Sequence, residues 1–196
     1  VSNVKRCDFN KPFNCIKVIP ERTTKGLSNI NWQKKSIVWL DYEDELKMWM
    51  LEDIDTICLN AKSGNVIIIT LRRSLDSMSS KSFNDIFSEN IETDVILDDM
   101  HKLNSPKLLQ KIFLSRINNK LTNVFSPIDN NKKVKFYKVF SFVYEDGAPM
   151  YTFGGFFLND EDHRDFLNCK FHDLEFIKEG AQEYNITCPI ITNKEF

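Results

Sequence analysis

The fold is decided by residues 36–44, SIVWLDYED, a short apolar run that ends abruptly in carboxylates. An amphipathic stretch follows over about residues 43–62, then Gly64, and then a second apolar run at 65–71. Residues 36–71 therefore predict one strand–helix–strand unit, whose two strands lie parallel with a right-handed crossover. Ligands of such sheets bind beyond the carboxyl ends of the strands, and the carboxylates that end residues 36–44 lie at such a position.

The stretch between the two strands has the pattern of a helix with one buried face. Apolar residues recur there at spacings of three and four, and Ser63-Gly64 ends the pattern as a helix stop. The stripe comprises Leu46, Met50, Ile54, Ile57, Cys58 and Ala61. The second strand, Asn65–Leu71, is apolar on both faces, which predicts a central strand covered by helices on both sides.

Three further elements can be predicted along the chain. Phe13–Ile19 is a short strand candidate closed by Pro20, and a helix begins near Ser105-Pro106, where serine can cap and proline can occupy the first turn. A polar loop over 72–81 leads to a short helix that begins at Ser82. The apolar stripe of the longer helix comprises Leu108, Leu109, Ile112, Phe113, Ile117, Leu121 and Val124.

The last predicted element is an antiparallel hairpin. Lys133–Tyr144 and Met150–Leu158 are two β-rich runs on either side of residues 145–148, Glu-Asp-Gly-Ala. Asp-Gly between apolar runs is a strong hairpin signal, and Gly147 should have a positive φ at the turn. The order of elements is thus a parallel unit first and an antiparallel hairpin last.

Composition and charge restrict the class of protein. The 196 residues are 42% hydrophobic and 28% charged, as in an ordinary soluble globular domain, and the net charge of −2 does not indicate nucleic acid as a partner. The five cysteines contain no C-x-x-C pair, so neither a disulfide framework nor a zinc knuckle is indicated. The chain shows no membrane span and no signal-peptide pattern, so we expect a cytoplasmic protein.

The order of elements resembles the second half of a class I S-adenosylmethionine-dependent methyltransferase, whose sheet carries one reversed strand near its edge. More narrowly, about residues 5–160 resemble bacterial proteins described as putative O-methyltransferases. The motifs that carry the resemblance are residues 9–13 (FNKPF), 39–42 (WLDY), 63–70 (SGNVIIIT) and 144–150 (YEDGAPM). It implies that Phe13–Ile19, Ile37–Asp41 and Asn65–Leu71 are the third, fourth and fifth strands and that the hairpin forms the last two.

The chain departs from this family where the cofactor would bind. Such enzymes resemble one another in a glycine-rich turn after the first strand and in an acidic residue after the second strand that holds the ribose. The six glycines here include no G-x-G, and the residues before Phe13 cannot supply two strands. Together with Val1 as the first residue, this suggests either that the cofactor half lies on a missing N-terminal segment or that the protein is a degenerate relative. The chain by itself should therefore bind S-adenosylmethionine very weakly or not at all.

The predicted site residues lie at the end of the fourth strand and just past the fifth strand. A carboxylate at Asp41 can accept a proton from a substrate hydroxyl, Tyr42 would line the pocket, and Arg72 and Arg73 could hold an anionic substrate. The alternatives are that Asp41 and the carboxylates of residues 43–45 cap the following helix, and that the two arginines form a solvated loop. No residue is assigned to the cofactor.

Two other groups of residues are interpreted as structural. His163 and the acidic residues of the stretch 159–175 are too close in sequence to converge on a metal, so we expect a solvated acidic loop and no metal site. The aromatic residues of the hairpin could stack nucleobases, but apolar residues on both faces favour a buried sheet.

The sequence thus predicts one α/β domain over residues 1–196, a Rossmann-like methyltransferase sheet without its first strands, with an irregular C-terminal segment at 159–196. The leading function is methyl transfer from S-adenosylmethionine to an unknown acceptor. The alternative is a catalytically inactive module of the same fold that binds a partner protein or a nucleotide-like ligand. A metal-dependent nuclease that uses the carboxylates after Leu40 is less favoured, because those carboxylates are adjacent rather than converging from separate strands.

Overall fold

The computed structural model describes residues 4–74, 86, 106–124, 133–145, 147–177 and 183–187. Where one domain was predicted, the chain divides into two compact units, Val1–Asn31 and Trp32–Phe196. The short helix predicted to begin at Ser82 lies outside the described residues, apart from Ile86, which is helical and buried.

The first unit contains two short helices, α1 (Val4–Asn10) and α2 (Thr23–Ser28). The prediction of a strand at Phe13–Ile19 is wrong. Residues 12–15 form a bend and a turn, the Ile16 N–H donates to the Phe13 carbonyl at 3.2 Å, and Phe13 is 67% exposed. A strand needs a neighbour for its backbone groups, and the described residues of this unit include no strand to pair with.

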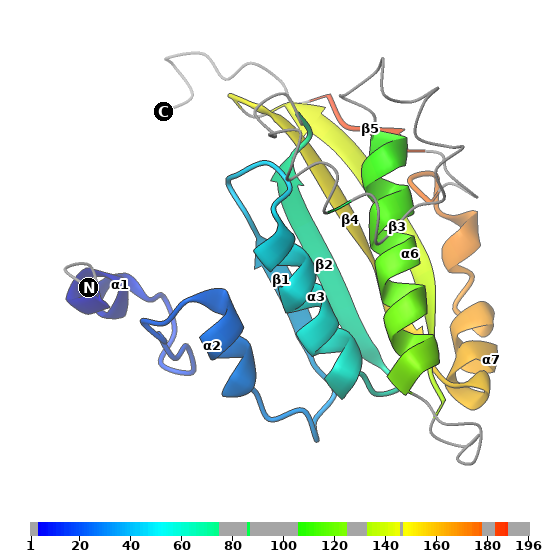
Figure 1. Cartoon of the computed structure of the whole chain (residues 1–196), viewed down its shortest axis with the longest axis horizontal. Coiled ribbons are helices and arrows are strands. Elements are labelled where there is room, and N and C mark those ends of the chain that lie inside the picture. The colour runs from blue at the N-terminus through cyan, green and yellow to red at the C-terminus, as the bar shows by residue number, and fades with distance from the viewer. Residues whose placement is uncertain are drawn as a thin grey trace. The chain divides into compact units, whose positions relative to one another are not determined.

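The second unit is built on a five-stranded sheet of order β1-β2-β4-β3-β5 (Figure 1). The strands are β1 (Ile37–Asp41), β2 (Asn65–Arg72), β3 (Lys135–Glu145), β4 (Pro149–Leu158) and β5 (Tyr184–Asn185). β1 is parallel to β2, β5 is parallel to β3, and β4 is antiparallel to both of its neighbours. Four strands therefore share one direction, and the reversed strand lies between β2 and β3. This mixed α/β arrangement is compatible with a methyltransferase-like fold.

The predicted strand–helix–strand unit is confirmed. β1 and β2 pair in parallel register from Ile37 opposite Val66 to Asp41 opposite Thr70. The connecting helix, α3 (Met48–Asn60), begins later than the predicted residue 43. The reason is that the chain is still bonded to β2 there: the Tyr42 N–H donates to the Thr70 carbonyl, and the Arg72 N–H donates to that of Asp44.

The long helix and the hairpin are also confirmed. Helix α6 runs over Pro106–Val124, and β3 and β4 pair over their whole length with one irregularity between Lys138 and Phe140. The turn between them contains Gly147 with a φ of 67°, as the Asp-Gly signal predicted. At Gly155, opposite the irregularity, an added Cβ would collide with the Tyr137 carbonyl oxygen, so the two backbones approach closely there.

The hydrophobic core lies between the sheet and the two longer helices. Figure 1 shows α3 over β1 and β2 and α6 beside it on the same face. Met50, Leu51 and Ile54 of α3 are almost fully buried, and Phe113 of α6 lies with its ring centroid 5.6 Å from that of Phe153 on β4. The two apolar stripes predicted from the sequence therefore face this core. All their residues are buried except Val124, whose side chain the structure does not describe.

The opposite face of the sheet, here called the open face, is only partly covered. On β1, Ile37 is 73% exposed and Trp39 is 61% exposed, while Val38 and Leu40 point to the core. Within the described part of the chain, the helix predicted to cover this side of β2 is not found. The open-face residues Val66 and Ile68 are half-buried and lie beside Ile37 and Trp39 in the sheet.

The C-terminal part of the second unit covers the other half of the open face. The stretch predicted as an acidic loop contains helix α7 (Asp160–Asn168) and the 3-10 helix η3 (Phe171–Asp173). Asn159 caps α7 by accepting from the Asp162 N–H at 2.7 Å, and the acidic first turn complements the positive end of the helix. Phe166 and Phe171 then pack on Phe156 of β4.

Replacing Gly147 by Val should lower the free energy of unfolding by about 1 kcal/mol or more, because a β-branched residue is strained at positive φ. An added Cβ would contact nothing within 4 Å, so the backbone alone should cause the loss. Denaturant unfolding of the 196-residue chain measures the effect. Gly147→Asn is the matched control, because asparagine tolerates this conformation and should cost less. Equal stability of the Val variant and the wild type would contradict the assignment of strain to this turn.

Candidate functional site

The candidate site lies at the edge of the sheet where β1, β2, β3 and β5 end and β4 begins. Backbone hydrogen bonds join the segments that follow these strands: Tyr42 donates to Thr70, Arg72 to Asp44, and Arg73 to Pro149. The four residues predicted from the sequence, Asp41, Tyr42, Arg72 and Arg73, thus come to one edge of the sheet. Their side chains, however, take different directions.

Asp41 is the last residue of β1, and its side chain is exposed on the open face. It follows Trp39 on that face and lies opposite Thr70 of β2. A carboxylate at this position meets solvent and is accessible to a molecule that binds at this edge of the sheet.

A row of hydrogen-bonded side chains crosses the open face beside Asp41. The Trp39 Nε1–H donates to Thr70 Oγ1 at 3.0 Å, Thr70 Oγ1 and Thr152 Oγ1 are 2.9 Å apart, and Thr152 Oγ1 donates to the Tyr144 hydroxyl at 3.4 Å. The row joins β1, β2, β4 and β3, and it fixes the indole of Trp39 over the sheet. Sequence reasoning missed it, because only the strand register brings these residues side by side.

Tyr42 points the other way, into the core. Its hydroxyl donates to Asp53 Oδ2 of α3 at 2.9 Å, and its ring meets that of Trp49 edge-on at 5.1 Å. Burial raises the pKa of Tyr42 far above its usual value, and the negative charge and hydrogen bond of Asp53 raise this pKa further. The structure therefore places this hydroxyl in a packed interior next to a buried carboxylate, and it links the end of β1 to α3.

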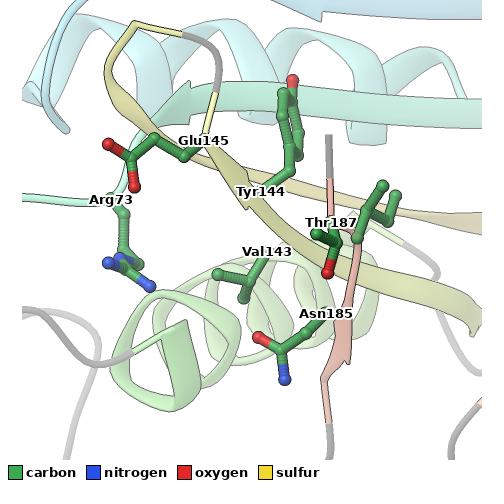
Figure 2. Close-up of a pocket in the computed structure, with 7 residues that line it drawn as sticks. Arg73, Val143, Tyr144, Glu145, Asn185 and Thr187 are labelled. Carbon is green, nitrogen blue, oxygen red and sulfur yellow. The ribbon is translucent and has the colours of Figure 1, made fainter. Parts of the chain in front are cut away.

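The two arginines are also separated. Arg72 is exposed at the end of β2, whereas Arg73 lines a pocket of about 560 Å3 (Figure 2). Within the described residues, the Arg73 Nε is buried and has no hydrogen-bond partner. The N–H of a guanidinium nitrogen in that position can donate a hydrogen bond to an oxygen atom of a ligand.

The remaining walls of the pocket are mixed in polarity. They consist of Val143, Tyr144, Glu145, Asn185, Ile186 and Thr187, from β3 and from β5 and the residues that follow it. Figure 2 shows Val143 and Asn185 on one side of β3 and Tyr144 on the other. Asn185 and Thr187 add neutral donors and acceptors, and Glu145 adds a negative charge next to the cation of Arg73. The pocket thus fits a polar small molecule or group better than an apolar one.

Capping of the following helix was the alternative considered for the carboxylates after Asp41, but none of them occupies the N-cap or the first turn of that helix. Helix α3 begins at Met48, has no acidic residue in its first turn, and has Lys47 at its N-cap. Asp44 instead forms an ion pair with Lys47 at 2.7 Å, and this hydrogen bond and charge lower the pKa of the exposed Asp44 carboxyl. The interpretation failed because the residues after β1 remain bonded to β2 and delay the helix.

No group of three or more potential metal ligands converges within the described part of the chain. His163 stacks on Tyr137 with ring centroids 3.9 Å apart, and His172 is an exposed neighbour of Asp173. The aromatic residues of the hairpin divide between the two faces of the sheet. Tyr151, Phe153 and Phe157 are fully buried on the helix side, in agreement with the buried-sheet interpretation for that face alone.

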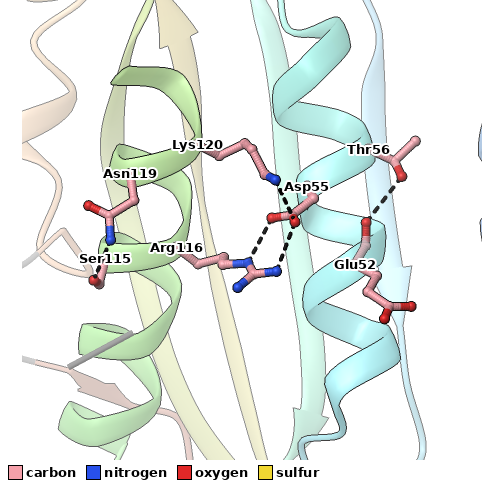
Figure 3. Close-up of polar contacts among 7 residues, drawn as sticks. All are labelled: Glu52, Asp55, Thr56, Ser115, Arg116, Asn119 and Lys120. Carbon is pink, nitrogen blue, oxygen red and sulfur yellow. Dashed lines mark hydrogen bonds and ion pairs between the residues drawn. The ribbon is translucent and has the colours of Figure 1, made fainter. Parts of the chain in front are cut away.

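A charged cluster holds the two core helices in place above the sheet (Figure 3). Arg116 of α6 donates two hydrogen bonds of 2.7 and 2.8 Å to the carboxylate of Asp55 of α3, and Lys120 Nζ lies 2.8 Å from the same carboxylate. Nearby, burial raises the pKa of the Cys58 thiol to about 12, so this cysteine is unreactive at neutral pH. This cluster is structural, because it lies between the helices, away from the strand ends.

Replacing Tyr42 by Phe should lower the free energy of unfolding by about 1–3 kcal/mol, because the buried Asp53 would lose a hydrogen-bond donor. Denaturant unfolding measures the loss. Tyr144→Phe is the matched control, since its half-buried hydroxyl makes only a long contact of 3.4 Å and should cost less. If both variants lost the same amount, the Tyr42–Asp53 hydrogen bond would not be the cause.

The comparisons with known proteins agree with the resemblance to putative O-methyltransferases. A family model described as "Putative O-methyltransferase" matches residues 1–196. No curated protein and no solved structure matches the chain. Among the described residues, no helix is long and apolar enough to cross a membrane. The family match covers the whole sequence given, so the chain belongs to this O-methyltransferase family.

Proposed function

We propose that this protein takes part in the transfer of a methyl group to the oxygen of a small acceptor, with Asp41 as the proton acceptor. The observation that carries the proposal is the family match over residues 1–196, because it gives the type of reaction. The exposed carboxylate at the end of β1 then supplies a residue of the right chemistry at the edge where ligands of such sheets bind.

We assign the role of proton acceptor to Asp41 because a hydroxyl group that acts as a nucleophile must lose its proton. A hydroxyl oxygen that gains a methyl group must release its proton, and a carboxylate within hydrogen-bond reach can take it. Asp41 is the carboxylate that the strand itself positions, whereas Asp44 is held by Lys47. The proton would therefore move from the acceptor hydroxyl to an oxygen of Asp41.

We assign the binding of the acceptor to Arg73 and its pocket. A guanidinium with a buried and unpartnered Nε favours an acceptor that carries an anionic or strongly polar oxygen group. Arg72 is exposed at the same edge and would add positive charge without enclosing the ligand. Strands in a sheet lie about 4.8 Å apart, so three strand steps separate Asp41 on β1 from the residues of β3 by roughly 14 Å. An acceptor that reached both would have to be elongated.

S-adenosylmethionine is the methyl donor that the family description suggests, but the described residues do not fit it. Binding of this cofactor in the class resembled relies on a glycine turn after a strand, and the described glycines of the second unit lie elsewhere. Gly64 precedes β2, Gly147 is in the hairpin turn, and Gly154 and Gly155 are within β4. We therefore assign no residue of this chain to the cofactor.

Replacing Asp41 by Asn should lower the rate of methyl transfer by roughly 100-fold or more, because the amide keeps the size of the side chain but cannot take the proton. Transfer of a labelled methyl group, measured on the protein as its gene encodes it, tests this. Glu43→Gln is the matched control, since it removes a neighbouring exposed carboxylate. A rate equal to wild type in Asp41→Asn would eliminate Asp41 as the proton acceptor.

A non-catalytic interaction module is the second candidate function, and a specific observation favours it. Ile37 and Trp39 form an exposed apolar surface on an edge strand, which suits a binding surface more than a reaction site. The module would bind a partner protein or a nucleotide-like ligand and would transfer no methyl group.

Calorimetric titration of S-adenosylmethionine into the 196-residue chain should give very weak binding or none, with a dissociation constant above about 1 mM. The physical reason is the lack of a glycine turn at the strand ends among the described residues. Tight binding would contradict this and would require a different assignment of the strands. Titration of the protein as its gene encodes it then separates the two functions, since no binding there would favour the module.

A further inference from the structure

We propose that two copies of this chain associate through β1, edge to edge, in an antiparallel two-fold arrangement that makes one continuous sheet. β1 is the edge strand of the sheet, and its second edge pairs with no strand of the described residues. The Val66 N–H donates to the Ser36 carbonyl and the Tyr42 N–H to that of Thr70, so even-numbered residues face β2. The backbone groups of Ile37, Trp39 and Asp41 therefore point outward along the free edge.

This edge lacks the protection that natural sheets place on their edge strands. Such strands are usually protected by proline, a bulge, charged residues or a very short length, and the only charged residue of β1 is Asp41 at its end. Here the outward residues Ile37 and Trp39 are large, apolar and 73% and 61% exposed. Trp39 is also held in place by its hydrogen bond to Thr70, so it would lose little side-chain freedom on association. An edge of this kind is expected to be covered by another strand.

The charges that flank β1 identify a second copy of the chain as the partner. Lys34 and Lys35 precede the strand and Glu43 and Asp44 follow it, and all four are exposed. A two-fold axis through Trp39 pairs residues whose numbers sum to 78. Lys35 then faces Glu43 of the second copy, and Lys34 faces Asp44 of the second copy, which also forms an ion pair with Lys47 of its own chain.

This charge pattern meets the requirement of an isologous interface. A two-fold dimer joins the same surface of both copies, so that surface must complement itself. A strand with one charge sign at its start and the other at its end does so when paired antiparallel, and it would repel its copy in parallel pairing. The two Trp39 side chains would be direct neighbours on the open face, where cross-strand aromatic pairs stabilise a sheet.

Sedimentation velocity of the 196-residue chain over a range of concentrations tests the proposal. The wild type should dimerise. Lys34→Glu with Lys35→Glu makes both ends of the strand acidic, and Glu43→Lys with Asp44→Lys makes both ends basic, so each double variant should raise the dissociation constant about 10-fold or more. A mixture of the two variants should restore dimers, because their charges are complementary at both ends.

Lys107→Glu with Lys133→Glu is the matched control, since it makes the same change of charge at exposed residues outside the strand, and it should dimerise like the wild type. A wild type that stays monomeric at all concentrations, dimers that persist in both double variants, or a mixture that fails to dimerise would each overturn the proposal. Hydrogen exchange tests the proposal without a variant. The exchange rates of the Ile37, Trp39 and Asp41 amides should fall as the concentration of the wild type rises. Exchange that is independent of concentration would also overturn it.

Discussion

The parallel pairing of β1 with β2 is the constraint on which the rest of the second unit depends. A parallel pair needs a crossover, so α3 must lie across one face of these strands and bury its apolar stripe there. The same pairing brings the ends of both strands to one edge of the sheet, where Asp41 and Arg73 are found. It also leaves β1 as an edge strand, with a free row of backbone groups.

The sheet is covered unequally on its two faces, and this asymmetry shapes the candidate site. α3 and α6 pack side by side on one face of the sheet, and the cluster of Asp55, Arg116 and Lys120 fixes their relative position. The opposite face is covered near β3 and β4 by the aromatic residues of α7 and η3, but it stays open over β1. Trp39 and Asp41 therefore meet solvent on the same strand whose other face is fully packed. A single strand thus serves both the core and the candidate site.

The candidate site combines groups with different surroundings, and their chemistry differs accordingly. Tyr42 and Asp53 share a buried hydrogen bond that holds the phenol protonated, so this pair belongs to the framework. Asp41 is exposed, and Arg73 keeps a buried nitrogen without a described partner, so these two can respond to a ligand. The family match suggests a methyltransferase-like function, and the residues that we propose for the acceptor lie at the edge where β1 and β2 end. Neither assigns a residue to the methyl donor.

Elements with local signals could be predicted from the amino-acid sequence alone. The 3.6-residue periodicity of α3 and α6, the apolar run of β2 and the Asp-Gly turn at Gly147 each arise from backbone preferences and from one buried face, so all were predictable. The predicted position of Asp41 and Arg73 after their strands also follows from chain order alone. Local signals failed at Phe13–Ile19, because this apolar segment has no described strand to pair with. They also failed at 160–168, where the Asn159 cap and an acidic first turn begin a helix in a stretch that was predicted to be a solvated loop.

The side of the sheet that each site residue occupies depends on long-range packing, which local patterns do not show. Alternation along β1 puts Asp41 in solvent and Tyr42 in the core, but which of the two faces is packed depends on where α3 and α6 lie. The row from Trp39 to Tyr144 exists because four strands from distant parts of the chain share one register. The pocket of Arg73 likewise requires β5 to lie beside β3. These features depend on long-range pairing, and no local pattern in a sequence encodes the partner of a strand.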